Sequence, residues 1–251
     1  MKIINDVAYG DLDAQKLDVY LPDAEAESVF LYFHGGGLER GDKDTVKRFS
    51  HYLAERNIAF VSVNYRMYPD YKYPDYIYDA AMSAKWTYDY MKRELKTDKL
   101  CIGGSSAGGY LSMMLCFDKK YLASVGMDNS LVAGYFHDAG QPTTHFNILK
   151  KERGIDPHRI IVDEAAPLYH IVPGENYPPM RFIVSDNDMK NRYEQTMLTV
   201  AALKTFDYTN VDYVVMHGTH CKYVGAIDEQ GKSVFGNMFL DFWKQLNKPL
   251  A

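Results

Sequence analysis

The sequence predicts an α/β fold, in which a mainly parallel central sheet is flanked by helices. Short apolar runs alternate along the chain with segments whose apolar residues recur at helical spacing, and this order is typical of βαβ units. Some runs, such as residues 29–33, are apolar throughout, which favours strands that are buried on both faces. No linker rich in Gly, Pro or Ser divides the 251 residues, so we expect a single domain over residues 1–251.

The elements follow from these two periodicities. Strands are predicted at residues 16–21, 29–33, 59–63, 99–103, 131–136, 181–184 and 211–216. Helices are predicted at residues 44–56, 76–95, 107–117, 192–206 and 232–246. In residues 44–56, for example, Val46, Phe49 and Leu53 recur at helical spacing. Residues 138–179 are rich in proline and least regular, so we expect an irregular insertion near the sheet's upper edge that shapes the pocket.

Composition excludes several classes of partner. The formal net charge is -5 and no dense Lys/Arg block is present, which argues against nucleic acid and against anionic membranes as partners. No apolar run approaches the roughly 20 residues of a spanning helix. Cys101, Cys116 and Cys221 are too widely spaced for a disulfide framework. With no signal peptide visible at the N-terminus, we expect reduced thiols and a cytoplasmic protein.

The segment from Gly104 to Gly108 reads Gly-Ser-Ser-Ala-Gly and matches the G-x-S-x-G pattern of a nucleophile elbow. An apolar strand enters it and an amphipathic helix leaves it, as that motif requires. The glycines permit a sharp turn from strand to helix. The turn holds Ser106 at a helix N-terminus, where N–H groups favour developing negative charge. The alternative is a turn in which Ser106 only caps the helix.

A second motif, His34-Gly35-Gly36-Gly37, follows the strand at residues 29–33. Three consecutive glycines let backbone N–H groups approach a ligand closely, and this HGGG-type pattern supplies one side of an oxyanion hole. The N–H of Ala107, the residue after the nucleophile, supplies the other side. No Lys-Ser/Thr pair follows the glycines, so a phosphate-binding P-loop is not indicated.

With both motifs, the chain resembles the α/β-hydrolase superfamily, and within it the hormone-sensitive-lipase-like and compact bacterial esterase branch. The stretches at residues 63–69 and 163–167 also resemble that branch. The resemblance implies Ser106 as nucleophile and Asp188 as the acid, with Asp186 as a rival. It implies His220 as the base, with His217 as a rival. It also implies oxyanion donors at Gly36 and Gly37, with Gly35 as a further candidate.

One departure concerns the N-terminus. The branch usually carries a helical cap before its glycine motif, whereas the 33 residues before His34 read as strands. We therefore expect no large N-terminal cap and a comparatively open pocket, which favours short acyl groups. Tyr65, Tyr68, Tyr71, Tyr73 and Tyr76 form a cluster that is suited either to stacking on sugars or to packing. His145 and Tyr169 are candidates for the pocket wall.

These observations predict a serine carboxylesterase acting on short acyl esters, with acetyl or feruloyl groups on carbohydrates such as xylan fragments as candidate substrates. The partner is then a small-molecule ester or an acylated saccharide, and the oligomeric state is left open, a homo-oligomer included. No cofactor and no metal are expected, because no compact Cys/His pattern accompanies the Asp and His residues near the C-terminus. The alternatives are an amide or formamide hydrolase of the same fold and an inactive hydrolase-fold binding protein.

Overall fold

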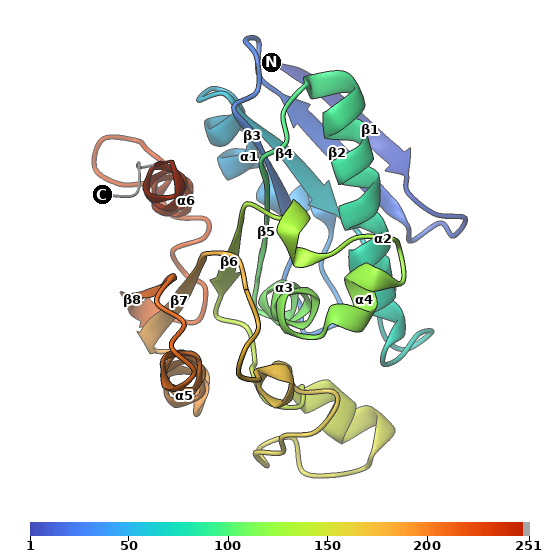
Figure 1. Cartoon of the computed structure of the whole chain (residues 1–251), viewed down its shortest axis with the longest axis vertical. Helices are drawn as coiled ribbons and strands as arrows, with labels where there is room; N and C mark the ends of the chain where they lie inside the picture. Colours follow the sequence, from blue (N-terminus) through green and yellow to red (C-terminus); the bar gives the residue numbers. More distant parts are fainter. Residues whose placement is uncertain (248–251) are drawn as a thin grey trace.

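The computed structural model describes residues 1–247, apart from the side chains of residues 47 and 48. Its strands are β1 (Lys2–Ala8), β2 (Lys16–Leu21), β3 (Ser28–Phe33), β4 (Ile58–Val63), β5 (Leu100–Ser105), β6 (Gly134–Asp138), β7 (Met180–Asn187) and β8 (Val211–Thr219). They form one eight-stranded sheet in the order β1-β2-β4-β3-β5-β6-β7-β8 (Figure 1). Strands β3 to β8 are parallel, whereas β1 and β2 are antiparallel to their neighbours. The predicted mainly parallel sheet is confirmed.

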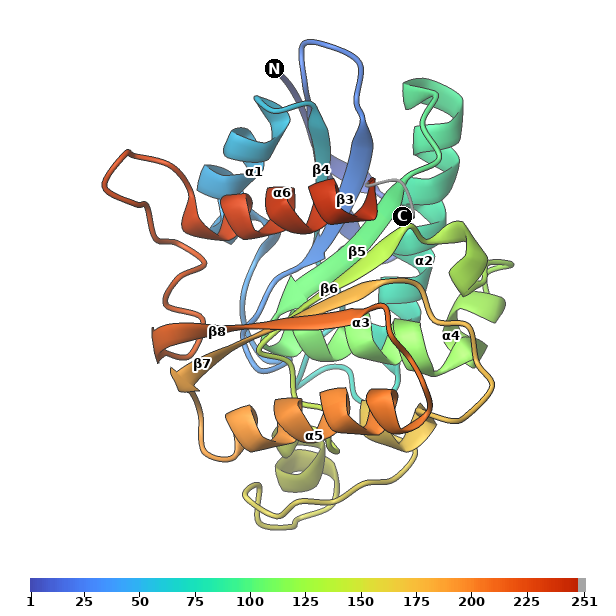
Figure 2. The same cartoon turned by 60° about the vertical axis from the view of Figure 1, so that its left-hand side comes forward.

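Helices cover both faces of this sheet (Figure 2). They are α1 (Lys47–Ala54), α2 (Asp75–Tyr90), α3 (Ala107–Phe117), α4 (Lys119–Ala123), α5 (Arg192–Thr205) and α6 (Val234–Leu246). Short 3-10 or π turns lie at η1 (Lys43–Val46), η2 (Met91–Leu95), η3 (Asn129–Leu131), η4 (Ile148–Glu152) and η5 (Pro167–His170). Helices α2, α3 and α5 share one core cluster with the sheet, and α1 and α6 share the other.

Aromatic side chains dominate the core beneath α1 and α6. Phe30 of β3 stacks on Phe239 of α6 with ring centroids 3.9 Å apart, and it meets Phe60 and Phe136 edge-on. Ser233 caps α6 by accepting a hydrogen bond from the N–H of Gly236 at 3.0 Å. The apolar face of α6 therefore lies across the middle of the sheet, over β3 and β6.

Strand β6 differs from the prediction at both ends for physical reasons. Strand β6 was expected at residues 131–136, but residues 129–131 form η3, in which the N–H of Ser130 donates to the side chain of Asp128. The strand then continues through His137 and Asp138, which are buried although polar. A strand prediction based on apolar runs stops at the first polar residues. The predicted strand therefore ended before His137 and Asp138. The five-residue helix α4 was also not expected.

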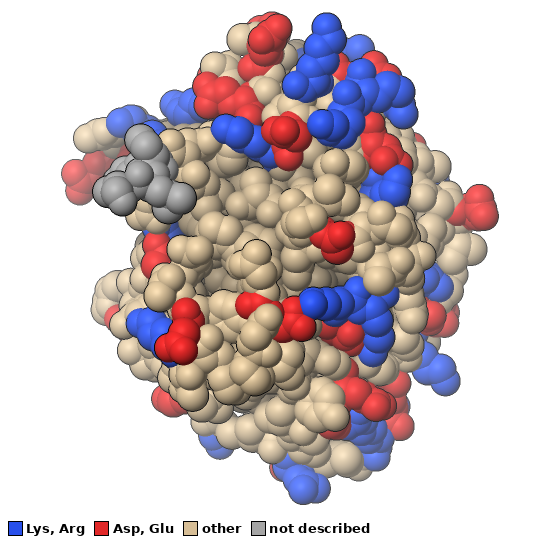
Figure 3. Space-filling view, viewed as in Figure 1, with Lys and Arg blue, Asp and Glu red and all other residues tan. Residues whose placement is uncertain are grey.

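The residues before His34 form β1, β2 and β3; β2 and β3 lie where strands were expected, whereas β1 was not among the predicted strands. Residues 139–179, all of which the structure describes, contain only the short turns η4 and η5. Among residues 1–247, no helix combines the length and the apolar composition that a bilayer crossing requires. On the face drawn in Figure 3, side chains of both charge signs surround a largely uncharged middle.

Candidate active site

The candidate nucleophile lies in a sharp turn between β5 and α3. Ser106 has φ 57° and ψ -113°, a conformation that L-residues rarely adopt. The turn can form because glycines lie two residues before and after Ser106: a Cβ on Gly108 would lie 1.9 Å from the carbonyl oxygen of Phe33. The N–H of Ser106 donates to the carbonyl of Asp138 at 2.8 Å, which ties the turn to the end of β6.

Three side chains from the carboxyl ends of different strands meet at this turn. Ser106 Oγ lies 2.8 Å from Nε2 of His220, which follows β8. His220 Nδ1 lies 2.5 Å from Oδ1 of Asp188, which follows β7. The Asp188 side chain is fully buried, whereas that of His220 keeps some exposure to the cleft. The structure therefore brings together the residues proposed as nucleophile, base and acid.

The charge of Asp188 is stabilised locally. Burial opposes ionisation of its carboxyl group, but hydrogen bonds from His220 and from the N–H groups of Met189 and Ser185 outweigh that effect and lower the pKa of Asp188. An ionised carboxylate accepts the Nδ1–H of the imidazole and leaves Nε2 free to accept a proton from a serine hydroxyl.

The two rival residues form a separate pair. His217 Nδ1 lies 2.6 Å from Oδ2 of Asp186, and the His217 side chain is 97% exposed. Neither residue contacts Ser106 in the described part of the chain. The Asp and His residues that were weighed as metal ligands thus divide into two pairs, and residues 1–247 hold no cluster of three or more such side chains suited to a metal.

The glycine loop after β3 faces the same turn. Gly36 and Gly37 have φ 123° and 70°, and a Cβ on Gly36 would lie 1.8 Å from the carbonyl oxygen of Arg40. Within the described residues, the N–H groups of Gly36 and Gly37 have no hydrogen-bond acceptor. Ala107 is the first residue of α3, so its N–H has no acceptor within the helix. These N–H groups are available to a ligand beside Ser106.

Tyr65 and His34 hold the glycine loop from below. The two rings stack with centroids 4.5 Å apart, and Tyr65 Oη donates to the carbonyl of His34 at 2.7 Å. His34 Nδ1 lies 2.7 Å from the carbonyl oxygen of Gly35. Burial lowers the pKa of His34, so this imidazole is neutral at pH 7. The His34 ring is therefore part of the loop's support and does not face the cleft.

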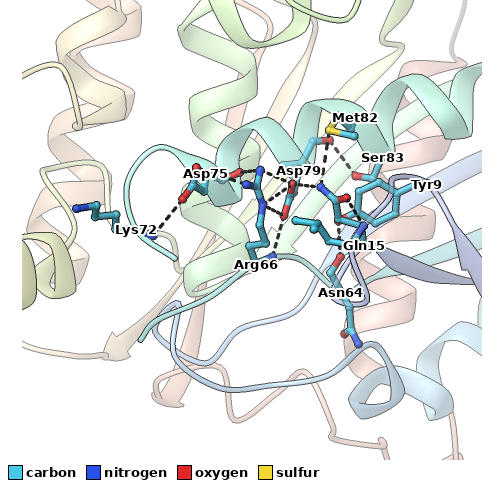
Figure 4. Close-up of polar contacts among 11 residues, drawn as sticks. Tyr9, Gln15, Asn64, Arg66, Lys72, Asp75, Asp79, Met82 and Ser83 are labelled. Atoms are coloured by element: carbon cyan, nitrogen blue, oxygen red, sulfur yellow. Dashed lines mark hydrogen bonds and ion pairs between the residues drawn. The ribbon is translucent and has the colours of Figure 1, made fainter. Parts of the chain in front are cut away.

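A buried ion pair fixes the segment that carries Tyr65 (Figure 4). Asp79 of α2 is fully buried and receives the guanidinium of Arg66, with Nη2 to Oδ1 at 2.7 Å and Nε to Oδ2 at 2.9 Å. Gln15 Nε2 donates to the same carboxylate at 2.6 Å, and the backbone N–H of Arg66 donates at 2.8 Å. The Arg66–Asp79 pair thus links α2 to the loop next to the glycine motif.

A second buried network behind Ser106 was missed by the sequence analysis. Asp138 accepts hydrogen bonds from the hydroxyls of Ser105 and Tyr223, and Tyr32 Oη donates to Ser105 Oγ at 2.6 Å. Burial raises the pKa of Asp138 to about 6, against the opposing effect of the two hydroxyls. Its position could have indicated this role, because Asp138 ends β6, the strand that pairs with β5 beside the nucleophile turn.

Two adjoining cavities give access to this site. A cleft of about 700 Å³ is lined by the glycine loop, Ser106 and His220. A second cavity of about 390 Å³ lies beside it, and Glu39, Phe146 and Met189 line both.

The two residues predicted for the pocket wall, His145 and Tyr169, lie elsewhere. His145 is buried against Tyr110 and Phe146, Tyr169 is exposed, and neither lines either cavity. Of the five clustered tyrosines, Tyr65, Tyr68 and Tyr76 are buried, which leaves packing as the role that their burial supports. The periodicity of apolar residues did not indicate this burial, because the segment from Tyr65 to Tyr73 is a loop that leads into α2.

Comparisons with known proteins agree with this architecture. A family model described as alpha/beta hydrolase fold matches residues 30–197. Esterase LipI of Mycobacterium tuberculosis is 34% identical over 97 residues, which cover 38% of this chain and 30% of that protein. Esterase LipC of the same organism is 26% identical over 242 residues, which cover 84% of this chain and 58% of that protein. The chain thus matches less than two thirds of the length of these relatives.

Among solved structures, esterase B from Lactobacillus rhamnosis superimposes with a TM-score of 0.78 at 18% identity, covering 98% of this chain and 85% of that one. This likeness shows the shared fold. The esterase relatives confirm the resemblance to the bacterial esterase branch. Because the family model covers residues 30–197 of the 251, the chain belongs to the α/β-hydrolase fold family.

Proposed function

We propose that this protein is a serine carboxylesterase with Ser106 as nucleophile, His220 as base and Asp188 as acid. The observation that carries the proposal is the hydrogen-bonded series from Ser106 Oγ through His220 to the buried Asp188, at the floor of a cleft. The esterase names of the relatives support the same class of reaction.

In the proposed reaction, Ser106 Oγ attacks the ester carbonyl while His220 Nε2 accepts its proton. The N–H groups of Gly36, Gly37 and Ala107 stabilise the negative charge on the carbonyl oxygen. His220 then delivers the proton to the leaving alcohol, and an acyl-Ser106 intermediate forms. Water, deprotonated by His220, hydrolyses this intermediate and restores the free serine.

We further propose short acyl esters as the substrate class, because none of the described residues before β3 lines the cleft around Ser106 and lengthens its wall. Acetyl esters of carbohydrates are candidates within that class, and feruloyl esters are a bulkier alternative, although the buried tyrosines do not support sugar stacking. The same groups would also cleave a reactive amide. Rates on matched ester and amide substrates distinguish the two bonds.

The first test is hydrolysis of p-nitrophenyl acetate, butyrate and octanoate by the wild type, Ser106→Ala and Ser105→Ala. We expect the wild type to prefer acetate or butyrate and Ser106→Ala to lose turnover by about 10⁴-fold or more. Ser105→Ala, which keeps the nucleophile, should retain turnover. Comparable activity of Ser106→Ala and wild type would overturn the assignment.

An inactive binding protein of the same fold is the alternative from another class. The 2.8 Å contact between Ser106 Oγ and His220 Nε2 argues against it, since that contact activates the hydroxyl. Covalent labelling of Ser106 by an organophosphonate, seen as a mass increase that Ser106→Ala lacks, would exclude the inactive alternative.

A further inference from the structure

The second cavity differs from the catalytic cleft in its charge. Four basic side chains line it, those of Lys150, Arg159, Lys190 and Arg192. They stand out in a chain whose net charge is -5. None of the four forms an ion pair with any residue that the structure describes. The cavity is therefore a basic recess beside a cleft in an otherwise acidic protein.

The single acidic side chain in the wall does not neutralise this recess. Glu39 is engaged in an ion pair with Lys151, which lies outside the cavity lining, and it accepts a hydrogen bond from Asn147 Nδ2 at 2.8 Å. These contacts lower the pKa of Glu39, with the hydrogen bond from Lys151 as the largest cause. Lys151 is therefore the main partner of Glu39, Lys150 adds a weaker attraction, and the lining keeps an excess of positive charge.

Arg192 is the most informative of the four because it is buried, with 4% of its surface exposed. The acceptors that the structure gives its guanidinium are neutral: Nη1 donates to the carbonyl of Ala139, and Nη2 donates to Oε1 of Gln141 at 3.3 Å. Burial lowers the pKa of Arg192, while the nearby charge of Asp188 opposes that effect. A buried cation without a carboxylate partner is costly unless a ligand supplies the anion.

The surroundings of Arg192 favour an anion at the same place. Arg192 is the first residue of α5, so the partially positive end of this 14-residue helix faces the cavity. Gln141 Nε2 is held by Thr144 O at 2.9 Å, which orients Oε1 toward Arg192. The planar guanidinium fork matches the two oxygens of a carboxylate.

We propose that this recess binds a carboxylate carried by the ester substrate, at a position remote from the scissile bond. The proposal rests on the proposed esterase function and narrows its substrate class to anionic esters. Phe146 and Met189 border both cavities, so a substrate with its carbonyl at Ser106 reaches the recess past these two side chains.

The experiment compares two matched pairs of esters by pH-stat at neutral pH. Monomethyl adipate against methyl hexanoate places the carboxylate on the acyl side; 4-acetoxybutanoate against butyl acetate places it on the alcohol side. For one pair, we expect the wild type to prefer the anionic member by about tenfold in kcat/KM. Added salt should reduce this preference, because part of it arises from exposed charges.

The test variant is Lys150→Gln/Lys190→Gln, which lowers the preference severalfold. Its matched control, Lys92→Gln/Lys96→Gln, should keep the preference. It removes two exposed charges before the start of β5, at the amino ends of the parallel strands and away from Ser106. The exposed lysines are substituted rather than Arg192, because Arg192 also holds the Ala139 carbonyl and its loss would disturb the fold.

The outcomes separate the two proposals. Faster turnover of an anionic ester, reduced in the test variant alone, supports the recess. Equal rates for both members of both pairs, or an anionic preference that survives the lysine substitutions, overturn the recess and leave the esterase proposal standing. If the wild type hydrolyses none of the four esters and no p-nitrophenyl ester, both proposals fail.

Discussion

Two Asp–His pairs lie at the ends of β7 and β8, and their sequence spacing alone does not distinguish them. Asp186 pairs with His217 at the surface, and Asp188 pairs with His220 against Ser106. The pairing follows from the β7–β8 register, which shifts between Ser185 and Asn187. A shift of this kind leaves no mark in the periodicity of apolar residues. The sequence therefore predicted Ser106 from a motif, whereas the choice of acid relied on a family resemblance.

We predict different effects for the two aspartates. Asp188→Asn removes the carboxylate that accepts the His220 Nδ1–H and should lower kcat by about 10³- to 10⁴-fold. Asp186→Asn, an isosteric change on an exposed pair, should lower kcat less than about threefold. Steady-state rates on p-nitrophenyl butyrate decide this, and a larger loss in Asp186→Asn would transfer the acid role to Asp186.

Asp138 gives a prediction about stability and pH. Its pKa rises from 3.8 to about 6 on folding, so the folded state is penalised when Asp138 ionises. The neutral Asp138 carboxyl group contributes about 3 kcal/mol to the free energy of unfolding. This contribution is fully present below about pH 4 and is lost as the pH rises through about 6. Asp138→Asn lacks this ionisation. Relative to the wild type, the variant's free energy of unfolding should therefore improve by that amount between pH 4 and pH 7, measured by urea titration; a difference independent of pH would contradict it.

Among the elements, the loop from β4 to α2 connects stability to the site. It carries Tyr65, which supports the glycine loop through His34, and it is anchored by Arg66 on the buried Asp79. The sequence indicated this stretch through its resemblance to the esterase branch. It did not indicate Gln15 as a further partner of Asp79, because Gln15 lies 64 positions away and only the fold brings the two together.

The two carboxylates near Arg66 allow a matched test at this element. Asp79→Asn leaves Arg66 without its buried partner and should lower the free energy of unfolding by about 3 kcal/mol. Asp75→Asn removes a partly exposed carboxylate 3.5 Å from the same guanidinium and should cost less than about 1 kcal/mol. Urea denaturation measures both, and equal losses would show that burial of the Arg66–Asp79 pair is not what stabilises the loop.

On the scale of the whole molecule, the sheet separates two helical layers that contribute differently to the site. The face with α2 and α3 supports the nucleophile turn and Tyr65, whereas α1 and α6 cover the aromatic cluster around Phe30. The alternation of strands and helices predicted both layers. It could not predict that polar ends of strands, such as Asp138, stay buried, since that depends on hydroxyl partners contributed by distant elements.

The two tryptophans test whether these layers unfold together, as the expected single domain requires. Trp86 lies on α2, where it stacks on Tyr90, and Trp243 is buried on α6, so each reports on one face of the sheet. In Trp86→Phe, the remaining fluorescence follows the α6 layer; in Trp243→Phe it follows the α2 layer. Because strands β3 to β6 contact both layers, we expect the urea midpoint from fluorescence to equal that from far-ultraviolet circular dichroism within each variant. A fluorescence transition that precedes the dichroism transition in either variant would mean that the corresponding layer unfolds on its own, and residues 1–251 would then comprise more than one cooperative unit.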